Sequence, residues 1–439
     1  MRLCVADRRG ELDVRDGMRP AARSGALVVP LRDGDVRPLP EGATIAHLPG
    51  RRAIGIDPRG TAVELEERWL PVAAILPVGH LRTLLPASRP GPRAPRLPLF
   101  GYAAVAERGG ELVVAALPTD AFAWWEPSRH TTAGLPAAVA AARRALPGNR
   151  LVDHLARCAL EHRCYTAQNT FLRRYEGALP ASPACNADCL GCISLQTDSG
   201  APAAQPRIAR APTSDDLIAV GRQHLRRAAE AGEAGMVSFG QGCEGEPLLR
   251  ERQLLEVARV LRREFPTATI HINTNGSRPS VLRRLFDAGV NSCRISIFSF
   301  DQLLFAAYYR PRGYDIDDVM ESCRTAARSG AQLTVNLLTF PGISDSPKEV
   351  ELSIARLGEL GVRQLQLRTL NVDPLWLLGR IPQLDPGIGI DILVERLKAS
   401  LPLLQLGNFT RPIIATSSSG AREGSRSRIR LGRSQGLVD

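Results

Sequence analysis

Three cysteines fall within eight residues of this 439-residue chain, in the stretch "CNADCLGC" at positions 185–192. The whole chain has only 9 cysteines, so this C-x3-C-x2-C segment holds a third of them. Thiolates are preferred ligands of zinc and of iron–sulfur clusters. An odd number of clustered cysteines indicates metal binding or catalysis in a reducing compartment, rather than a disulfide framework.

The number of available ligands separates the metal interpretations. A structural zinc site takes four ligands, and no second C-x2-C or H-x3-H follows the triplet. An electron-transferring [4Fe–4S] cluster also takes four thiolates. Three thiolates on such a cluster leave one iron open for a substrate or cofactor. The spacing alone leaves two possibilities, a cluster with an open iron and a zinc knuckle with a distant fourth ligand.

The elements that must position this triplet follow a repeating pattern between about residues 176 and 400. Apolar β-runs alternate with amphipathic stretches, which is typical of a parallel sheet with helical crossovers. The runs lie at 236–240, 268–274, 292–298, 332–340 and 364–370. With a first strand near "GALPASP" (177–183), this predicts about six β/α units in a partial barrel. The triplet then lies on a loop after the first strand, where barrel chemistry is expected.

Two features mark the helix boundaries of this repeat. Glycine precedes each following β-run at 235, 289, 330 and 361, and a glycine there is expected to end the helix in the left-handed conformation. The segment "SPKE" at 346–349 predicts a helix start with a capping box and proline in the first turn.

We therefore expect an α/β chain of four segments. Residues 1–130 carry short apolar runs between Gly-containing turns, which predicts a β-rich N-terminal domain. Residues 131–178 show helical periodicity and form a helical connector. Cys158 and Cys164 in this connector are predicted to pack in the core, and metal ligation is the alternative. Residues 179–405 form the partial (β/α)6 barrel, and 410–439 form a disordered basic tail.

The charge of the chain does not by itself indicate a nucleic-acid partner. The net charge is +11, but only Lys348 and Lys398 are lysine, so 54 of the 56 basic residues are arginine, spread along the chain. Apolar runs end well before the length of a membrane span, and the first residues lack the apolar region of a signal peptide. We expect a cytoplasmic protein that binds no membrane and no nucleic acid.

The C-x3-C-x2-C spacing after the first strand of a β/α repeat resembles the radical S-adenosylmethionine (radical SAM) superfamily. In that family three thiolates hold a [4Fe–4S] cluster, whose open iron chelates SAM. Reductive cleavage of SAM gives a 5′-deoxyadenosyl radical, which abstracts hydrogen from a substrate. The resemblance implies that Cys185, Cys189 and Cys192 are the cluster ligands.

The segment "GQGCEGEP" at 240–247 resembles the family's Gly-Gly-Glu segment, in which backbone carbonyls receive the SAM ammonium group. This implies that Gly242, Gly245 and Glu246 bind the cofactor. Cys243 lies on the same loop, and we expect its thiol to face the chamber in which the radical forms, as a hydrogen-atom donor or a covalent handle. A small residue that fills space under the turn is the alternative.

Two further segments match on the next strands. "NTNG" (273–276) resembles the family's Thr-Asn-Gly turn, which implies that Asn275 faces SAM or the substrate. In "CRISIF" (293–298), Arg294 and Ser296 alternate with apolar residues and share one face of the strand. The family often uses polar groups there for the SAM carboxylate and ribose.

One position departs from the family pattern. The residue before the third cysteine is usually aromatic and lies near the adenine, whereas here it is Gly191. The adenine must then be held otherwise, for example by Leu190 or Ile193. This departure does not affect the cluster ligands.

The resemblance implies an enzyme that cleaves SAM, with a reductant such as flavodoxin or ferredoxin and an unidentified small-molecule or peptide substrate. The alternative is a non-enzymatic iron–sulfur or zinc protein that senses redox state or binds a partner. The candidates for substrate contact follow the fifth and sixth strands: Asn336, Arg368, Asn371 and Asp373. The N-terminal domain is expected to cap the barrel mouth or recruit a partner.

Overall fold

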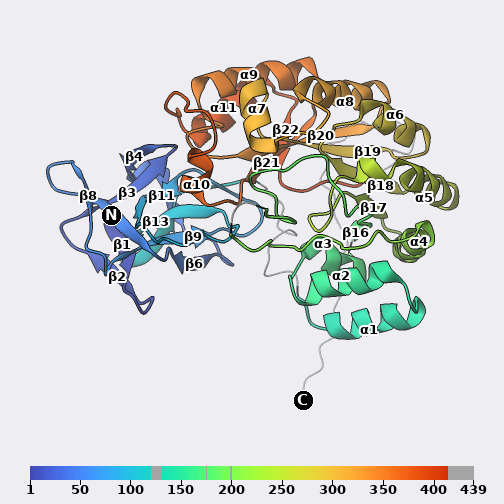
Figure 1. Cartoon of the computed structure of the whole chain (residues 1–439), viewed down its shortest axis with the longest axis horizontal. Coiled ribbons are helices and arrows are strands. Elements are labelled where there is room, and N and C mark those ends of the chain that lie inside the picture. Colours follow the sequence, from blue (N-terminus) through green and yellow to red (C-terminus); the bar gives the residue numbers. More distant parts are fainter. Residues whose placement is uncertain (120–130, 175, 198–199, 414–439) are drawn as a thin grey trace, which may run out of the picture.

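The computed structural model describes residues 1–119, 131–174, 176–197 and 200–413 of the chain. Three parts follow one another in Figure 1: an N-terminal part made of strands, a short helical part, and a larger part in which helices line a parallel sheet. The N-terminal β part lies beside the carboxyl ends of β20 and β21, as the contacts below show. The disordered tail predicted for 410–439 begins too early, because residues 410–413 are bonded to the sheet. From residue 414 onward the predicted tail lies outside the described residues. No described helix has the length and apolar character needed to cross a membrane.

The N-terminal part confirms the β-rich expectation for residues 1–119, and residues 120–130 lie outside the described ranges. Its strands pair antiparallel in a 7-stranded, a 6-stranded and a 2-stranded sheet. Its elements are β1 (Arg2–Ala6), β2 (Leu12–Arg15), β3 (Arg19–Ser24), β4 (Leu27–Pro30), η1 (Asp33–Asp35), β5 (Arg37–Pro38), β6 (Thr44–His47), β7 (Arg51–Ile56), β8 (Ala62–Glu64), β9 (Leu70–Ile75), β10 (His80–Arg82), β11 (Leu85–Pro86), β12 (Ser88–Pro90), β13 (Tyr102–Arg108), β14 (Glu111–Val114) and β15 (Ala116–Pro118).

Aspartate and glycine together make two of the predicted turns. Gly10 and Gly60 have φ of 86° and 88°, a conformation that favours glycine. In both turns an aspartate accepts a backbone N–H four residues on: Glu11 donates to Asp7 at 2.9 Å and Thr61 donates to Asp57 at 2.8 Å. These local bonds explain why the turn signals in the N-terminal part predict strand ends well.

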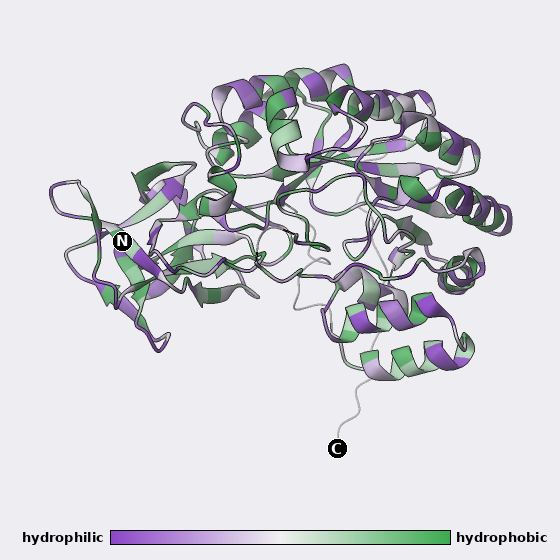
Figure 2. Cartoon of the chain, viewed as in Figure 1, coloured by the Kyte–Doolittle hydropathy of each residue, from purple (hydrophilic) through white to green (hydrophobic). Residues whose placement is uncertain are grey.

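The helical part consists of α1 (Leu135–Ala145), α2 (Arg150–Leu160) and α3 (Tyr165–Leu172). Figure 2 shows hydrophobic and hydrophilic residues alternating along α1 and α2, so each helix has one apolar side. On α2 that side buries Leu151, Leu155 and Cys158. Asn149 begins α2 and accepts the backbone N–H groups of Leu151 and Val152. The predicted burial of Cys158 and Cys164 is confirmed.

A 7-stranded parallel sheet forms the larger part, and its strands lie in sequence order. They are β16 (Glu176–Ala178), β17 (Met236–Phe239), β18 (Thr269–Thr274), β19 (Ser292–Ile297), β20 (Gln332–Thr339), β21 (Gln364–Thr369) and β22 (Gln405–Gly407). The alternation of strand and helix predicted from the sequence is therefore confirmed, with a short seventh strand beyond the expected units. The curvature of the sheet into a partial barrel stays a prediction.

The crossovers between strands are helical. They contain α4 (Ser214–Glu230), η4 (Pro247–Arg250), α5 (Glu251–Glu264), α6 (Pro279–Asp287), α7 (Gln302–Tyr309), α8 (Ile316–Arg328), α9 (Pro347–Glu359), α10 (Pro374–Leu378) and α11 (Ile390–Ser400). Figure 1 shows α5, α6, α8, α9 and α11 along the outer side of the sheet. The opposite face of the sheet is contacted by loops and by the C-terminal segment described below.

Two boundary predictions need correction. Gly289, Gly330 and Gly361 follow their helices with positive φ as expected, but α4 ends at Glu230 and its left-handed residue is Gly232. Gly235 instead lies directly before β17. Ser346 begins α9 without a capping hydrogen bond to its side chain, and Glu349 interacts with Ser299 in the loop after β19, so the predicted capping box is absent.

The face of the sheet away from the helices is polar, which is unusual for a parallel sheet buried on both sides. Apolar residues alternate with polar ones along each central strand, and the register places the polar ones side by side: Asn273 lies beside Arg294, and Ser296 beside Asn336. His271 lies on this face, bonded to Ser292 and Asn273 at 2.8 and 2.9 Å. Burial lowers the pKa of His271 to about 3, so its ring is neutral at physiological pH.

The C-terminal segment 408–413 runs along this polar face. The side-chain amides of Gln364 and Gln366 on β21 donate to Phe409 O at 2.8 Å and Thr410 Oγ1 at 3.1 Å. Three residues beyond Thr410, the Ile413 N–H donates to Thr269 Oγ1 on β18 at 2.8 Å. The segment therefore occupies the end of the face at which the strands begin, and the carboxyl end is left to the loops.

The N-terminal part packs against the loops after β20 and β21. Arg51 and Asp373 form an ion pair at 2.6 Å in which each side chain is only 4% exposed. Arg82 donates to Leu370 O at 3.3 Å, and burial lowers its pKa to about 9. Nearby, the Gly25 N–H donates to Pro341 O at 2.9 Å. Buried polar contacts of this kind fix the orientation of the β part over this edge of the sheet.

We predict that Arg51→Ala destabilises the protein by about 3–5 kcal/mol, because Asp373 would keep a buried charge without its partner. The Arg51→Met/Asp373→Asn double variant should recover part of this loss, since it removes both charges. Denaturant unfolding of the three proteins gives the free energies. Equal stability of Arg51→Ala and the unaltered protein would show that the pair contributes nothing.

Candidate functional site

The cysteine triplet lies on the long loop after β16, and α7 holds that loop in place. The backbone N–H groups of Asp188 and Leu190 donate to the carbonyls of Tyr309 and Tyr308, each at 3.0 Å. Arg310, the residue that follows α7, donates to Asp188 O at 2.6 Å. These bonds fix the backbone on either side of Cys189. The backbone around Cys189 therefore has a defined shape, although residues 179–197 contain no helix or strand.

The three thiols share an environment that suits metal ligands. Cys185, Cys189 and Cys192 are all partly buried. Burial raises the pKa of Cys185 and Cys189; Glu246 and Cys192 raise that of Cys185 further, and Cys192 and Cys185 raise that of Cys189. The three ligand atoms do not all lie within 4.8 Å of one another. Arg207 donates to Cys192 Sγ at 3.6 Å. A guanidinium beside the sulfurs stabilises thiolates, the form that binds iron.

A buried glutamate joins the cysteine loop to the turn after β17. One carboxylate oxygen of Glu244 accepts the N–H groups of Ala181 and Ser182 at 2.7 and 2.8 Å. The other accepts those of Gly240 and Gln241, both at 2.7 Å. Burial raises the pKa of Glu244 to about 7, and the four donors oppose that rise because they stabilise the carboxylate. The sequence analysis did not single out this residue.

The second glutamate, Glu246, links the same turn to the loop after β18. Its carboxylate accepts the Thr274 hydroxyl at 2.6 Å and the Asn275 N–H at 2.8 Å. The Asn275 side chain donates to Asn186 Oδ1 on the cysteine loop at 2.9 Å. Glu246 is 3% exposed. Its carboxylate therefore positions the predicted cofactor residues Asn275 and Gly245, rather than offering itself to a ligand.

Glycine is required in the turn because backbone segments meet there. A Cβ on Gly245 would lie 2.0 Å from Ala184 O, and one on Gly240 would lie 1.8 Å from Asn273 O. A Cβ on Gly242 would meet Gln205 Oε1 at 2.5 Å. The Gly245 N–H donates to Ser182 O at 2.6 Å. The turn thus lies directly against the cysteine loop, as a cradle for a ligand held on both would require.

Arg294 and Ser296 lie on the polar face of the sheet, as predicted, and both are partly exposed. Arg294 donates to Gln366 Oε1 at 2.9 Å, and Asn336 donates to Ser296 Oγ at 3.2 Å. These bonds connect β19 to β20 and β21. A guanidinium and a hydroxyl on this face suit a carboxylate and a ribose, the groups that the resemblance assigns to them.

The space beside Gly191 is filled by an aromatic residue from elsewhere in the chain. A Cβ on Gly191 would lie 2.9 Å from the Tyr308 hydroxyl and 2.8 Å from Leu370 Cδ1. Tyr308 lies on α7 and stacks on Phe298 with ring centroids 4.4 Å apart. The glycine before the third cysteine is therefore required for packing, and Tyr308 brings an aromatic ring to the cysteine loop.

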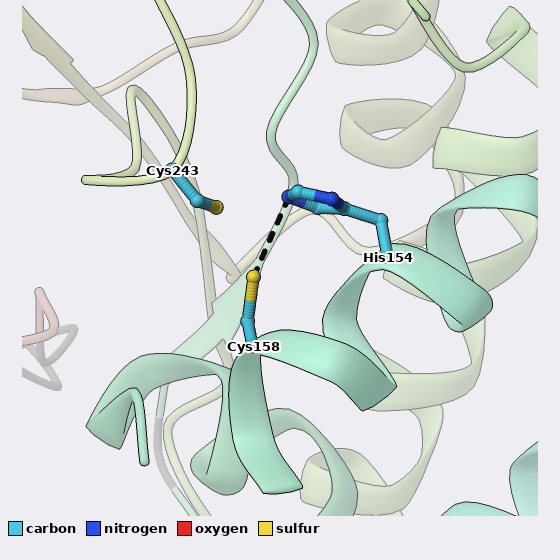
Figure 3. Close-up of side chains that lie close together, drawn as sticks. All are labelled: His154, Cys158 and Cys243. Carbon is cyan, nitrogen blue, oxygen red and sulfur yellow. Dashed lines mark hydrogen bonds between the residues drawn. The ribbon is translucent and has the colours of Figure 1, made fainter. Parts of the chain in front are cut away.

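Besides Glu246, which positions other residues, two candidate residues lie elsewhere than the sequence predicted. Cys243 was expected to face a reaction chamber, but its side chain is 1% exposed and points toward α2 (Figure 3). A hydrogen-atom donor must reach the substrate, so this placement does not support a catalytic role. Asp373 was a candidate for substrate contact, but it is buried in the ion pair with Arg51.

The residues present fit an iron–sulfur cluster and SAM. Three thiols on one restrained loop, with a guanidinium at Cys192, are a suitable donor set for three irons. The turn at Gly245 brings backbone to within contact of that loop, where a side chain would fill the space. Cys185, Cys189 and Cys192 would hold the cluster. Gly242, Gly245, Asn275, Arg294 and Ser296 would surround the cofactor.

Comparison with known proteins identifies the class. Residues 179–352 match the family model described as the Radical SAM superfamily. This segment of the chain therefore belongs to the radical SAM superfamily, whose members use a [4Fe–4S] cluster and SAM. It includes the cysteine triplet, both glutamates and strands β17–β20. A search of curated proteins found no match.

Several solved structures are similar in fold. A radical SAM methyltransferase from Sphaerobacter thermophilus is 18% identical, with a TM-score of 0.39 over 54% of this chain and 65% of that chain. Streptococcus suis SuiB bound to its precursor peptide SuiA is 15% identical, with a TM-score of 0.34 over 53% and 46%. Methylornithine synthase (PylB) is 15% identical, with a TM-score of 0.37 over 63% and 71%. The chain spans less than two thirds of the first two structures.

We predict that Cys189→Ala abolishes the [4Fe–4S] absorption and all SAM cleavage, because two thiolates cannot anchor the cluster. Cys323→Ala removes a fully buried thiol from α8, away from the triplet, and should leave both unchanged. Iron and acid-labile sulfide content, measured after anaerobic reconstitution, gives the first readout. Full cluster content in Cys189→Ala would contradict the assignment.

We predict that Glu244→Gln weakens the join between the two loops. Its amide N–H2 would face two backbone donors, and each lost hydrogen bond to a buried group costs about 1–3 kcal/mol. We expect lower thermal stability and weaker SAM binding by calorimetry, with the cluster retained. Glu395→Gln, on the exposed side of α11, is the matched control. Unchanged stability and affinity in Glu244→Gln would show that the carboxylate is dispensable.

Proposed function

We propose that this protein is a radical SAM enzyme whose cluster is held by Cys185, Cys189 and Cys192. When bound, the cluster and SAM supply a 5′-deoxyadenosyl radical that abstracts hydrogen from a substrate. The observation that carries the proposal is the pair of buried glutamates. Glu244 and Glu246 bring the cysteine loop, the Gly245 turn and Asn275 together at one end of the sheet.

The chain's own residues have separate tasks in this proposal. The backbone of Gly242 and Gly245 would receive the SAM ammonium group, because the carbonyls of Cys243 and Glu244 already accept bonds from Ile208 and Ser194. Arg294 would bind the carboxylate of SAM, and Ser296 the ribose. Tyr308, rather than an aromatic neighbour of the third cysteine, supplies the ring nearest to Gly191.

The substrate would lie over the polar face of the sheet, between the cysteine loop and β20. Asn336 is 8% exposed there, and its Oδ1 has no hydrogen-bond partner among the described residues. The N-terminal β part packs on the loops after β20 and β21 and would exclude water from that side. The substrate itself, small molecule or peptide, stays unidentified, as does the flavodoxin or ferredoxin expected as reductant.

The test is reductive cleavage of SAM by the reconstituted full-length protein. Dithionite and SAM under anaerobic conditions should yield 5′-deoxyadenosine and methionine, detected by mass spectrometry, and Cys189→Ala should yield neither. Cluster content without any cleavage would instead favour the non-enzymatic iron–sulfur protein. A protein that takes up zinc but no iron at the triplet would favour the zinc alternative.

A further inference from the structure

A second group of metal-ligating side chains lies apart from the cysteine triplet. It consists of His154 and Cys158 on α2 and Cys243 on the turn after β17 (Figure 3). Their ligand atoms all lie within 4.8 Å of one another, and no other group in the described part of the chain meets this limit. From these three residues we propose a zinc site that joins α2 to the turn carrying Gly242 and Gly245.

The spacing of the atoms fits zinc. His154 and Cys158 are four residues apart on α2 and therefore share one face of the helix. The distance from His154 Nε2 to Cys158 Sγ is 3.5 Å. Zinc bonds of about 2.3 Å to sulfur and about 2.0–2.1 Å to nitrogen, at a tetrahedral angle, separate the two atoms by about 3.5 Å. The pair already has the separation that a shared zinc ion imposes.

The third ligand comes from a different element, and its direction supports the site. Cys243 lies between Gly242 and Glu244, yet its sulfur is turned toward α2 and not toward the cysteine triplet (Figure 3). Cys158 and Cys243 are each 1% exposed, whereas His154 is half-buried. Ligands from a helix and a distant loop would let one ion connect the two segments, and zinc also occurs with three protein ligands and a water in the fourth position.

The charges of the group also favour a divalent cation. The Cys243 thiol acts as hydrogen-bond donor to Cys158 and, with His154, lowers the pKa of Cys158 to about 5. The pKa of Cys243 is raised in turn, chiefly by Cys158 and by burial. A buried thiolate is costly without a cation, so a divalent ion would stabilise both sulfurs in their ionised form. Two thiolates, one neutral imidazole and Zn²⁺ have no net charge.

The neighbouring Cys164 provides a natural control. Its backbone N–H donates to Cys158 O at 2.9 Å, and it is buried to a similar degree. Its sulfur does not join the group within 4.8 Å, so the proposal excludes it as a ligand. The fourth position of the zinc is left to water. Cys164→Ala therefore removes a thiol from the same neighbourhood without touching the proposed site.

The test is the zinc content of the full-length protein, measured by elemental analysis beside its iron. We expect one zinc per chain in the reconstituted protein. It should persist in the Cys185→Ala/Cys189→Ala/Cys192→Ala variant, which excludes zinc held by the triplet. Cys158→Ala and Cys243→Ala should each lose it, and Cys164→Ala should keep it. His154→Ala should bind zinc at least about 10-fold more weakly in competition with a chelator.

Cobalt gives a readout that does not depend on the folding of the single variants. Co²⁺ added to the triple variant should produce thiolate-to-cobalt charge-transfer absorption, and Zn²⁺ should abolish it. Absence of stoichiometric zinc or cobalt in the triple variant would overturn the proposal. So would zinc retained in both Cys158→Ala and Cys243→Ala, zinc lost in Cys164→Ala, or a Cys158–Cys243 disulfide in the isolated protein. None of these results depends on SAM cleavage.

Discussion

The burial of Glu244 is the constraint on which the rest of the site depends. A carboxylate removed from water needs hydrogen bonds to compensate for its lost hydration, and this one takes four backbone N–H groups from two loops. The loops after β16 and β17 can therefore approach each other in only one arrangement. In the same way, the buried carboxylate of Glu246 accepts hydrogen bonds from the loop after β18 and ties that loop to the turn after β17. Three separate strand ends become one rigid surface around the cysteines.

The sheet and the N-terminal part complete that surface from two sides. Below the loops, the polar face carries Arg294, Ser296 and Asn336, joined across three strands by side-chain hydrogen bonds. Beside them, Arg51 and Arg82 anchor the β part to the loops after β20 and β21. Arginine suits both tasks because its donors are numerous and fixed in geometry. The arginine-rich composition of the chain thus contributes to its interior as well as its surface.

The sequence predicted what depends on local pattern and missed what depends on long-range contacts. Strands β17–β21 and the helices between them follow from periodicity, and the glycines of 240–245 follow from a turn that must admit another backbone. The direction of Cys243 and the ion pair of Asp373 depend on partners 85 and 322 residues away, at Cys158 and Arg51, so no local pattern reveals them. For Glu244, a local signal did exist in the sequence: an acidic residue inside the glycine-rich segment 240–247 indicates a carboxylate that accepts backbone N–H groups.

The segment 408–413 has a consequence for the order in which the chain matures. Gln364, Gln366 and Thr269 make their side-chain bonds to residues that are synthesised after every strand of the sheet. While the chain emerges from the ribosome, the base of the polar face must therefore remain hydrated. Its amides exchange water for protein only when the segment 408–413 arrives. Enclosure of this interior thus comes after synthesis of the whole sheet, because these six residues follow its last strand.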